Sequence, residues 1–260
     1  MRHRLLPILI ASVLALALGA PALGAGPVVR FRPNLQTLTP TDLQIVVTPN
    51  GHRQLRLTNE VSNLGRGPIE LKPRKQDCDN DGHLMNDRTA YQRIYEDSNA
   101  NDVFDRGVDT TYVRRRVGCF TFDPAHGHWH FEDYASYQLF DLAGNLVKKH
   151  SKVGFCLVDN HHVSDGSLPG DPGAGGYYGH VVSVCGDLQV QGVSVGWADT
   201  YFWSLPGQFI GIGGVADGNY CLVSTTDPDN RIKETDENDN EARLQIAITG
   251  DTVETVSRPC

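Results

Sequence analysis

The sequence predicts an all-β protein: a β-sandwich core with long loops that metal ions and disulfides tether, and with little helix. Segments in which apolar and polar residues alternate, rich in β-branched and aromatic side chains, recur along the chain. Loops rich in Gly, Asp and Pro, such as residues 164–176, separate them. No window combines an apolar stripe of helical period with capping residues at both ends. These observations favour a sandwich over a helical fold.

The first 25 residues predict a signal peptide. Arg2 and Arg4 precede an apolar run from Leu5 to about Leu18, and small residues follow through Ala25. No later segment has the roughly 20 apolar residues that a membrane span needs. We therefore expect an exported protein, either extracellular or in the periplasm or cell envelope. Residues 26–260 would form one domain whose six cysteines form disulfides.

Seven segments after the signal peptide have the alternation expected of strands. They are residues 43–48, 53–61, 110–117, 128–141, 151–158, 219–225 and 242–249. The long connections between them predict functional loops, or loops held by ions and disulfides.

The charge balance limits the classes of partner. Asp and Glu outnumber Lys and Arg by 31 to 23, which gives a net charge of −8. This balance argues against nucleic acid or an anionic membrane as a partner. A basic substrate, such as an amine or a lysine-rich protein, suits it better.

Three histidines at alternate positions, His126, His128 and His130, predict a metal site. In a strand these side chains start on one face, and imidazole is a ligand for copper, zinc, iron or nickel. Three protein nitrogens leave an open coordination position for chemistry. The alternative is the solvent-facing polar face of a strand. The triplet alone does not choose between copper and zinc.

A straight strand would place the outer two histidines poorly. Their Cα atoms would be roughly 13 Å apart at ~3.3 Å per residue. An imidazole with a metal bond of about 2 Å reaches only some 6 to 7 Å from its own Cα. We therefore expect Gly127 to bend the chain, because glycine adopts backbone angles that other residues avoid.

The segments that follow resemble those of a known family. After the histidines come "HSKVGFCLVD" (150–159), "YGHVVSVCGDLQVQGVSVGWADTY" (178–201) and "DGNYCLVSTTDPDNRIKETDENDN" (217–240). This order resembles the lysyl oxidase catalytic domain from about Arg30 onward, with extra residues around 76–110. The resemblance implies that the three histidines are copper ligands. It also implies that Lys152 in "KVGFCL" and Tyr201 in "DTY" are the two residues that become linked in a lysine tyrosylquinone cofactor.

The resemblance implies a protein-lysine 6-oxidase-like amine oxidase. Such an enzyme uses dioxygen to convert a primary amine, or lysine in a protein, to an aldehyde with release of ammonia and hydrogen peroxide. The catalytic base stays open among Glu132, Asp133 and Asp199. Two alternatives are a non-catalytic calcium- or metal-binding extracellular or envelope protein, and a zinc hydrolase. Neither of them needs both Lys152 and Tyr201.

The extra segment contains two possible calcium loops. Asp77, Asp79 and Asp81 followed by Gly82 reproduce the start of a calcium loop, although its twelfth position is Arg88. A looser second set consists of Asp97, Asn99, Asn101 and Asp105. The alternative is a solvated acidic loop without an ion.

The resemblance also implies a structural calcium ion at "KETDENDN". Its ligands would be Asn34, the Leu35 carbonyl, Glu234, Asp236, Asp239 and Asn240. Asn34 stands where the family has aspartate and Asp239 where asparagine is usual, so the exchange keeps the charge. The ion would tie the first strand to the last loop.

Six cysteines allow fifteen disulfide pairings. The resemblance implies a disulfide between Cys156 and Cys185. The remaining four are assigned by elimination as Cys78 with Cys119 and Cys221 with Cys260.

Overall fold

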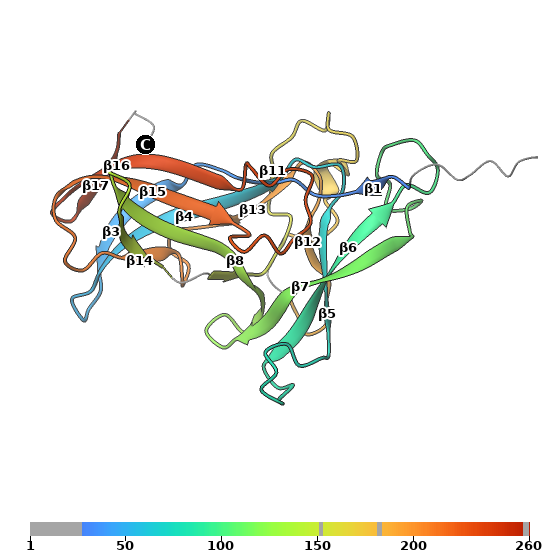
Figure 1. Cartoon of the computed structure of the whole chain (residues 1–260), viewed down its shortest axis with the longest axis horizontal. Helices are drawn as coiled ribbons and strands as arrows, with labels where there is room; N and C mark the ends of the chain where they lie inside the picture. The colour runs from blue at the N-terminus through green and yellow to red at the C-terminus, as the bar shows by residue number, and fades with distance from the viewer. Residues whose placement is uncertain (1–27, 151–152, 181–183, 257–259) are drawn as a thin grey trace, which may run out of the picture.

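The computed structural model describes residues 28–150, 153–180, 184–256 and 260, and its strands form two antiparallel sheets (Figure 1). The signal peptide predicted for residues 1–25 and the cofactor residue Lys152 lie outside the described residues. Within the described part, one short 3-10 helix (Gly173–Gly175) accompanies the strands. The predicted all-β class is therefore confirmed.

The larger sheet has eleven strands. Its main path is β12 (Gln191–Val193), β5 (Ile69–Arg74), β6 (Asp87–Glu96), β7 (Tyr112–Asp123), β8 (His128–Asp141), β15 (Gly218–Thr226), β16 (Glu241–Thr249) and β17 (Thr252–Thr255). Off this path, β1 (Arg30–Phe31) pairs with β6, while β9 (Leu146–Lys149) and β10 (Val153–Phe155) pair with β8. The histidine-bearing start of β8 thus lies between β7 and β10.

The smaller sheet has six strands arranged around one long strand. Its path is β11 (His161–His162), β13 (Trp197–Tyr201), β4 (Arg53–Asn63) and β14 (Phe209–Gly211), with β2 (Leu35–Thr37) and β3 (Thr41–Val47) also paired with β4. In Figure 1, β3 and β4 lie against β8, β15 and β16 at one end of the molecule, whereas β1, β5, β6 and β7 lie at the other.

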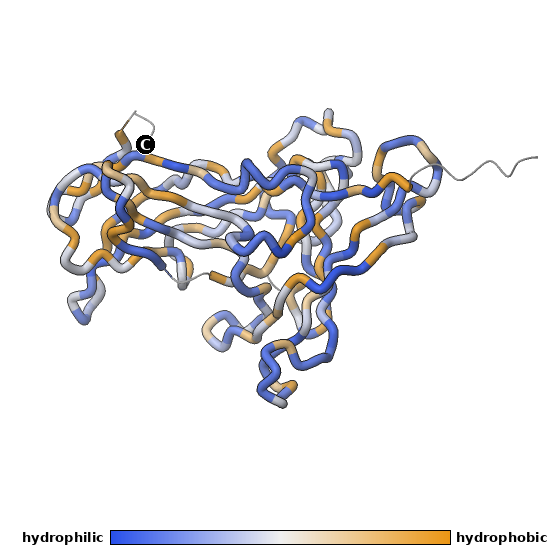
Figure 2. The backbone as a smooth tube through the Cα atoms, in the orientation of Figure 1, coloured by the Kyte–Doolittle hydropathy of each residue, from blue (hydrophilic) through white to orange (hydrophobic). Residues whose placement is uncertain are grey.

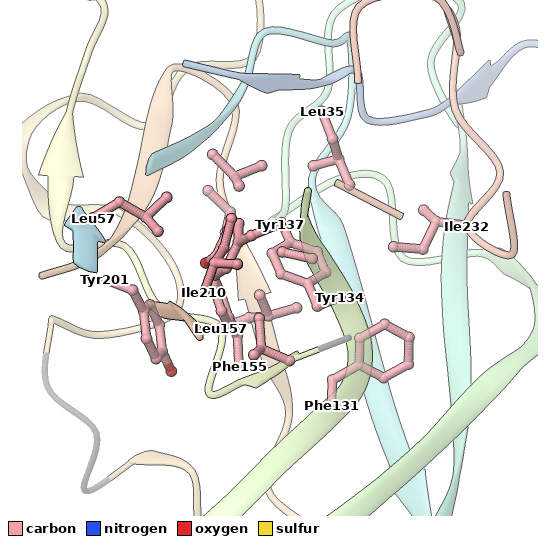
Figure 3. Packing of buried hydrophobic residues seen from close by; sticks show 14 of the residues in the cluster. Leu35, Leu57, Phe131, Tyr134, Tyr137, Phe155, Leu157, Tyr201, Ile210 and Ile232 are labelled. Carbon is pink, nitrogen blue, oxygen red and sulfur yellow. The ribbon is translucent and has the colours of Figure 1, made fainter. Parts of the chain in front are cut away.

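The core fills the space between the sheets because alternate side chains of each strand point inward. Leu55, Leu57 and Val61 from β4 meet Tyr137 and Leu139 from β8 in one buried cluster. Figure 2 shows apolar and polar residues alternating along these strands, and Figure 3 shows the packing. The same cluster includes the predicted cofactor residue Tyr201, so the site is continuous with the core.

Each of the seven predicted strands overlaps an observed one, but several strands were missed. The longest of these is β6, which lies within residues 76–110 and pairs with both β5 and β7. Seven of its ten residues are buried, on both faces, so it lacks the alternation of a half-buried strand.

All three predicted disulfides are confirmed: Cys78–Cys119, Cys156–Cys185 and Cys221–Cys260. No helix among the described residues is long and apolar enough to cross a membrane.

Candidate active site

The β7–β8 hairpin brings the three histidines together. Asp123 ends β7, and its carboxylate accepts hydrogen bonds from the main-chain N–H groups of Ala125 and His126. The chain then turns at Gly127, whose φ is +71°. The bend expected at Gly127 is therefore confirmed. His126 lies in the turn rather than on the strand, and only His128 and His130 belong to β8.

The ring nitrogens of the three histidines converge on one point. His130 Nε2 lies 3.1 Å from His126 Nδ1 and 2.9 Å from His128 Nε2. Nitrogens bound to one ion at about 2.0–2.1 Å would be separated by about 2.9–3.4 Å at bond angles between a right angle and the tetrahedral angle. The spacing therefore fits a single metal ion.

The surroundings of His128 and His130 favour the neutral imidazole that a metal ligand requires. Burial, followed by the neighbouring histidine charges, lowers the pKa of His130 to about 4. Burial also lowers the pKa of His128. His128 Nδ1 lies 3.0 Å from the carbonyl oxygen of His126, so a proton on Nδ1 leaves the Nε2 lone pair free for a metal.

Asp123 is a site residue that the sequence analysis missed. Its Oδ2 lies 3.5 Å from His130 Nδ1 and 3.6 Å from His126 Nδ1, so its charge favours ring nitrogens that carry a proton or a metal ion. The dipeptide Asp123–Pro124 is a turn signal that could have pointed to it.

Tyr201 shares a cavity with two of the histidines. This cavity, about 260 Å³ in volume, is lined by His126, His128, Cys156, Val158, Asn160, Asp199, Thr200, Tyr201, Phe202 and Leu205. The Tyr201 hydroxyl accepts a hydrogen bond from the Cys156 N–H, and it lies 3.2 Å from the Cys156 carbonyl oxygen, to which it can donate. Its ring stacks on Phe155 with the centroids 3.8 Å apart (Figure 3). Burial raises the pKa of Tyr201 well above its usual range.

The described residues that follow Lys152 run beside the histidines. In β10, Val153 pairs with Ala135 and Phe155 pairs with Phe131. A Cβ placed on Gly154 would lie 3.1 Å from the Cβ of His130. The described part of β10 therefore passes beside His130 at Gly154.

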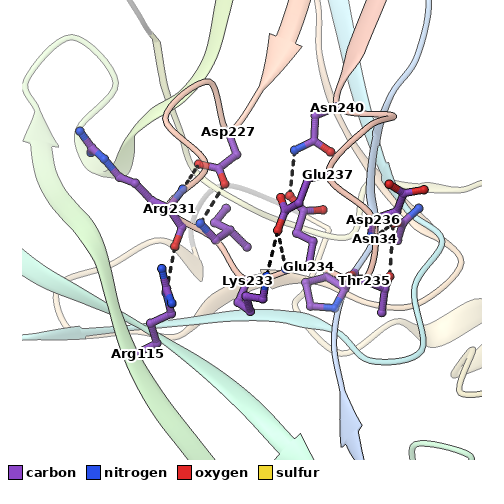
Figure 4. A network of polar contacts seen from close by, with 12 residues as sticks. Asn34, Arg115, Asp227, Arg231, Lys233, Glu234, Thr235, Asp236, Glu237 and Asn240 are labelled. Atoms are coloured by element: carbon purple, nitrogen blue, oxygen red, sulfur yellow. Dashed lines mark hydrogen bonds and ion pairs between the residues drawn. The ribbon is translucent and has the colours of Figure 1, made fainter.

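The residues predicted for the structural calcium ion partly gather between β2 and the loop after β15 (Figure 4). Glu234 accepts hydrogen bonds from the Leu35 N–H and the Asn240 side chain, and Asn34 donates to Asp239. Three oxygens of this cluster are buried without a hydrogen-bond partner among the described residues. They are Asp239 Oδ1, Asn240 Oδ1 and Glu237 Oε2.

The acidic groups that converge here differ from the predicted set. Carboxylate oxygens of Asp227, Glu234 and Glu237 lie within 4.8 Å of one another. The carboxylate of Asp236 instead accepts hydrogen bonds from Asn238. Sequence reasoning missed Asp227 and Glu237. Glu237 lies within "KETDENDN", whereas Asp227 lies six residues before that run, in "DPDN".

The two loops of the 76–110 segment share one geometry. In the first, Asp77 accepts from the Gly82 N–H at 2.8 Å, and carboxylate oxygens of Asp77, Asp79 and Asp81 lie within 4.8 Å of one another. In the second, Asp97 accepts from the Asp102 N–H, also at 2.8 Å. Asn99 and Asn101 accept from main-chain N–H groups of that loop, and the Asp105 N–H donates to the buried Asp109.

In this all-β protein, three convergent imidazoles beside a cavity lined by a buried tyrosine could hold one metal ion and leave a coordination position open. Comparison with known proteins makes this specific. The lysyl oxidase family model matches residues 98–258, which is more than half of the chain. The chain therefore belongs to the lysyl oxidase family.

Individual relatives agree with this assignment. Lysyl oxidase homolog 2A of Danio rerio is 26% identical over 186 residues, which cover 70% of this chain and 23% of that protein. Lysyl oxidase homolog 4 of Mus musculus is 30% identical over 49% of this chain and 15% of its own length. Protein-lysine 6-oxidase of Gallus gallus is 30% identical over 48% and 27%, respectively. The chain thus spans less than a third of each of these relatives.

Proposed function

We propose that the protein is an exported, copper-dependent amine oxidase. It would convert primary amines, including lysine side chains of proteins, to aldehydes, with dioxygen consumed and ammonia and hydrogen peroxide released. The observation that carries the proposal is the convergence of three imidazole nitrogens next to a cavity that Tyr201 lines. Family membership favours copper over zinc, because one matched relative is named protein-lysine 6-oxidase.

In this proposal His126, His128 and His130 hold the copper ion. Tyr201 and Lys152 are the precursors of a lysine tyrosylquinone. When bound, the metal and the quinone supply the oxidising power and an electrophile for the amine. The donor set fits, since three imidazole nitrogens lie at ligand spacing and the phenol opens onto the same cavity.

The protein's own residues position the phenol. The Cys156 main chain holds the Tyr201 hydroxyl, and the Phe155 ring covers one face of the phenol. Val158 and Leu205 contribute apolar side chains to the wall of the same cavity. An amine that enters this cavity meets the tyrosine ring and the histidines together.

Tyr201→Phe tests the proposal directly. The mature protein is loaded with copper, and hydrogen peroxide is measured after primary amines are added. Tyr201→Phe should lose turnover and keep its copper, because the phenol oxygen is needed for the quinone but is not a metal ligand. Tyr220→Phe is the matched control, since the Tyr220 hydroxyl donates to Ala216 on an exposed part of the molecule. Unchanged turnover in Tyr201→Phe would rule out the quinone assignment.

Calcium and export belong to the same proposal. One side-chain oxygen each of Glu237, Asp239 and Asn240 is buried without a hydrogen-bond donor among the described residues. Such acceptors are rare, which supports the proposal that a calcium ion binds near Glu234. The loops at Asp77 and Asp97 would hold further calcium ions.

Three disulfides support folding in an oxidising compartment outside the cytoplasm.

A further inference from the structure

Three carboxylates remain candidates for the catalytic base, and they line two different cavities. Glu132 and Asp133 line a cavity of about 420 Å³ beside His130, and Tyr201 does not contribute to its wall. Asp199 lines the smaller cavity that contains Tyr201. The position of the quinone precursor therefore separates Asp199 from the other two candidates.

Asp199 and Tyr201 are arranged by the pleat of one strand. They are two residues apart on β13, so their side chains leave the same face with Cα atoms roughly 6.6 Å apart. The register against β4 fixes both, because Asp199 pairs with Val61 and Tyr201 pairs with Asn59. A substrate atom next to the tyrosine ring would thus come within reach of the carboxylate.

One oxygen of Asp199 is held and the other is available. Asn160 Nδ2 donates to Oδ1 at 3.1 Å, and Asn160 is itself fixed by the Thr200 N–H at 2.8 Å. Oδ2 has no hydrogen-bond partner among the described residues, although Asp199 is fully buried. A buried polar oxygen without a partner is rare and marks a functional position.

We propose that Asp199 is the catalytic base that removes the proton from the carbon bearing the substrate nitrogen, and that Asn160 is its positioning residue. The inference rests on the proposed function. In this step the C–H bond breaks, the proton moves to Asp199 Oδ2, and the electron pair reduces the quinone. The proton becomes available again when dioxygen takes up two electrons and two protons and leaves as hydrogen peroxide.

The surroundings strengthen Asp199 as a proton acceptor. Burial, and then the charge of Asp159, raise the pKa of Asp199 well above its usual range, with Glu60 adding to the rise and the Val158 N–H opposing it. A carboxylate with a raised pKa is a stronger base than an exposed one.

The experiment compares Asp199→Asn with Asp251→Asn in the copper-loaded mature protein. Asp251 is the matched control because the substitution is identical and this exposed side chain pairs with Arg53 and lines neither cavity. The probe is n-butylamine, with and without deuterium on the carbon next to nitrogen. Readouts are the Lys152–Tyr201 cross-link by mass spectrometry, copper content, melting temperature, kcat, KM and the deuterium isotope effect.

Asp199→Asn should keep copper and cross-link, lose about 10²- to 10⁴-fold in kcat, and show a larger isotope effect with KM little changed. Asp251→Asn should stay within about threefold of the parent, since an exposed surface charge contributes little. Cross-linked Asp199→Asn with kcat close to that of the control would overturn the assignment. A purely structural role would lower the melting temperature and leave the isotope effect unchanged.

Asp199→Glu covers the case in which Asp199→Asn forms no cross-link. Its carboxylate should permit the cross-link and give slow turnover with an altered isotope effect. Two outcomes would overturn the inference. In the first, cross-linked Asp199→Glu matches the parent in both turnover and isotope effect. In the second, Asp199→Glu forms no cross-link. Absence of the cross-link in the copper-loaded parent would contradict the proposed function itself, and this inference with it.

Discussion

At the residue scale, Gly127 determines how the three imidazoles meet. Its φ of +71° lies in the left-handed region, and a Cβ there would meet no atom within 4 Å. A substitution would therefore cost backbone strain rather than a collision. That strain acts between His126 and His128, at the point where the metal ligands must stay together.

Gly127→Ala should weaken copper binding. The strain of about 1 kcal/mol for a non-glycine residue in this region corresponds to roughly a fivefold loss of affinity if the turn relaxes away from its native angles. Gly144→Ala is the matched control, because Gly144 has φ +86° and open space in the β8–β9 turn. Both variants should lose similar stability, and only Gly127→Ala should lose copper affinity in a competition titration. Equal copper affinities would contradict this role of the turn.

Some of the site residues could be predicted from the sequence and others could not. The spacing of the histidines and the bend at Gly127 follow from strand geometry and the reach of imidazole. Asp123 could not be assigned a role in advance, because its contacts with His126 and His130 arise only when the hairpin forms. The environment of Asp199 likewise depends on the pairing of β13 with β4, which is not a local property of the sequence.

At the element scale, the Cys156–Cys185 disulfide joins the two halves of the candidate site. The Cys185 carbonyl accepts a hydrogen bond from the Trp129 N–H between two histidines, and the Cys156 main chain holds the Tyr201 hydroxyl. The disulfide therefore fixes the histidine-bearing strand β8 relative to Tyr201. Cys221–Cys260 instead joins β15 to the end of the chain, away from that cavity.

Replacing each disulfide by an alanine pair should separate stability from site geometry. The closed loops have sequence separations of 29 and 39 residues, so each loss should cost on the order of 3–4 kcal/mol of unfolding free energy. Only the Cys156→Ala, Cys185→Ala pair should also lower copper affinity and amine turnover under conditions where both proteins are folded. Equal losses of turnover in the two pairs would argue against a positioning role for Cys156–Cys185.

The strands that sequence patterns predicted are mostly those with one apolar face. β6 was missed because its side chains are buried on both faces and because buried charges interrupt its pattern. Asp87 Oδ2 accepts hydrogen bonds from the Cys78 and Asp79 N–H groups, and Arg88 pairs with Asp187. Those partners are remote or lie in a loop, so alternation could not reveal the strand.

At the scale of the whole molecule, the cluster around Glu234 connects β2 to the loop before β16. Burial raises the pKa of Glu234 to about 8 in the calcium-free protein, so the folded state retains a proton that the unfolded chain releases. The unfolding free energy should therefore fall as pH rises from about 4.5 to about 8. A bound calcium ion would favour the carboxylate and remove that decline.

Calcium should accordingly raise the melting temperature more at pH 8 than at pH 5. Thermal unfolding in chelator and in excess calcium gives the comparison. Glu234→Gln should abolish most of the calcium effect, whereas Glu241→Gln should not, because Glu241 is exposed and pairs with Arg243. A calcium response that is the same at both pH values would count against Glu234 as a ligand.

The central claim is that copper held by the histidines allows Tyr201 and Lys152 to become one cofactor. The most direct measurement is peptide mass spectrometry of the mature protein after digestion, with and without copper. The account predicts a covalent Lys152–Tyr201 peptide pair in the copper-loaded protein and its absence in copper-free protein or in Tyr201→Phe. Fully copper-loaded protein that yields only separate Lys152 and Tyr201 peptides would contradict it.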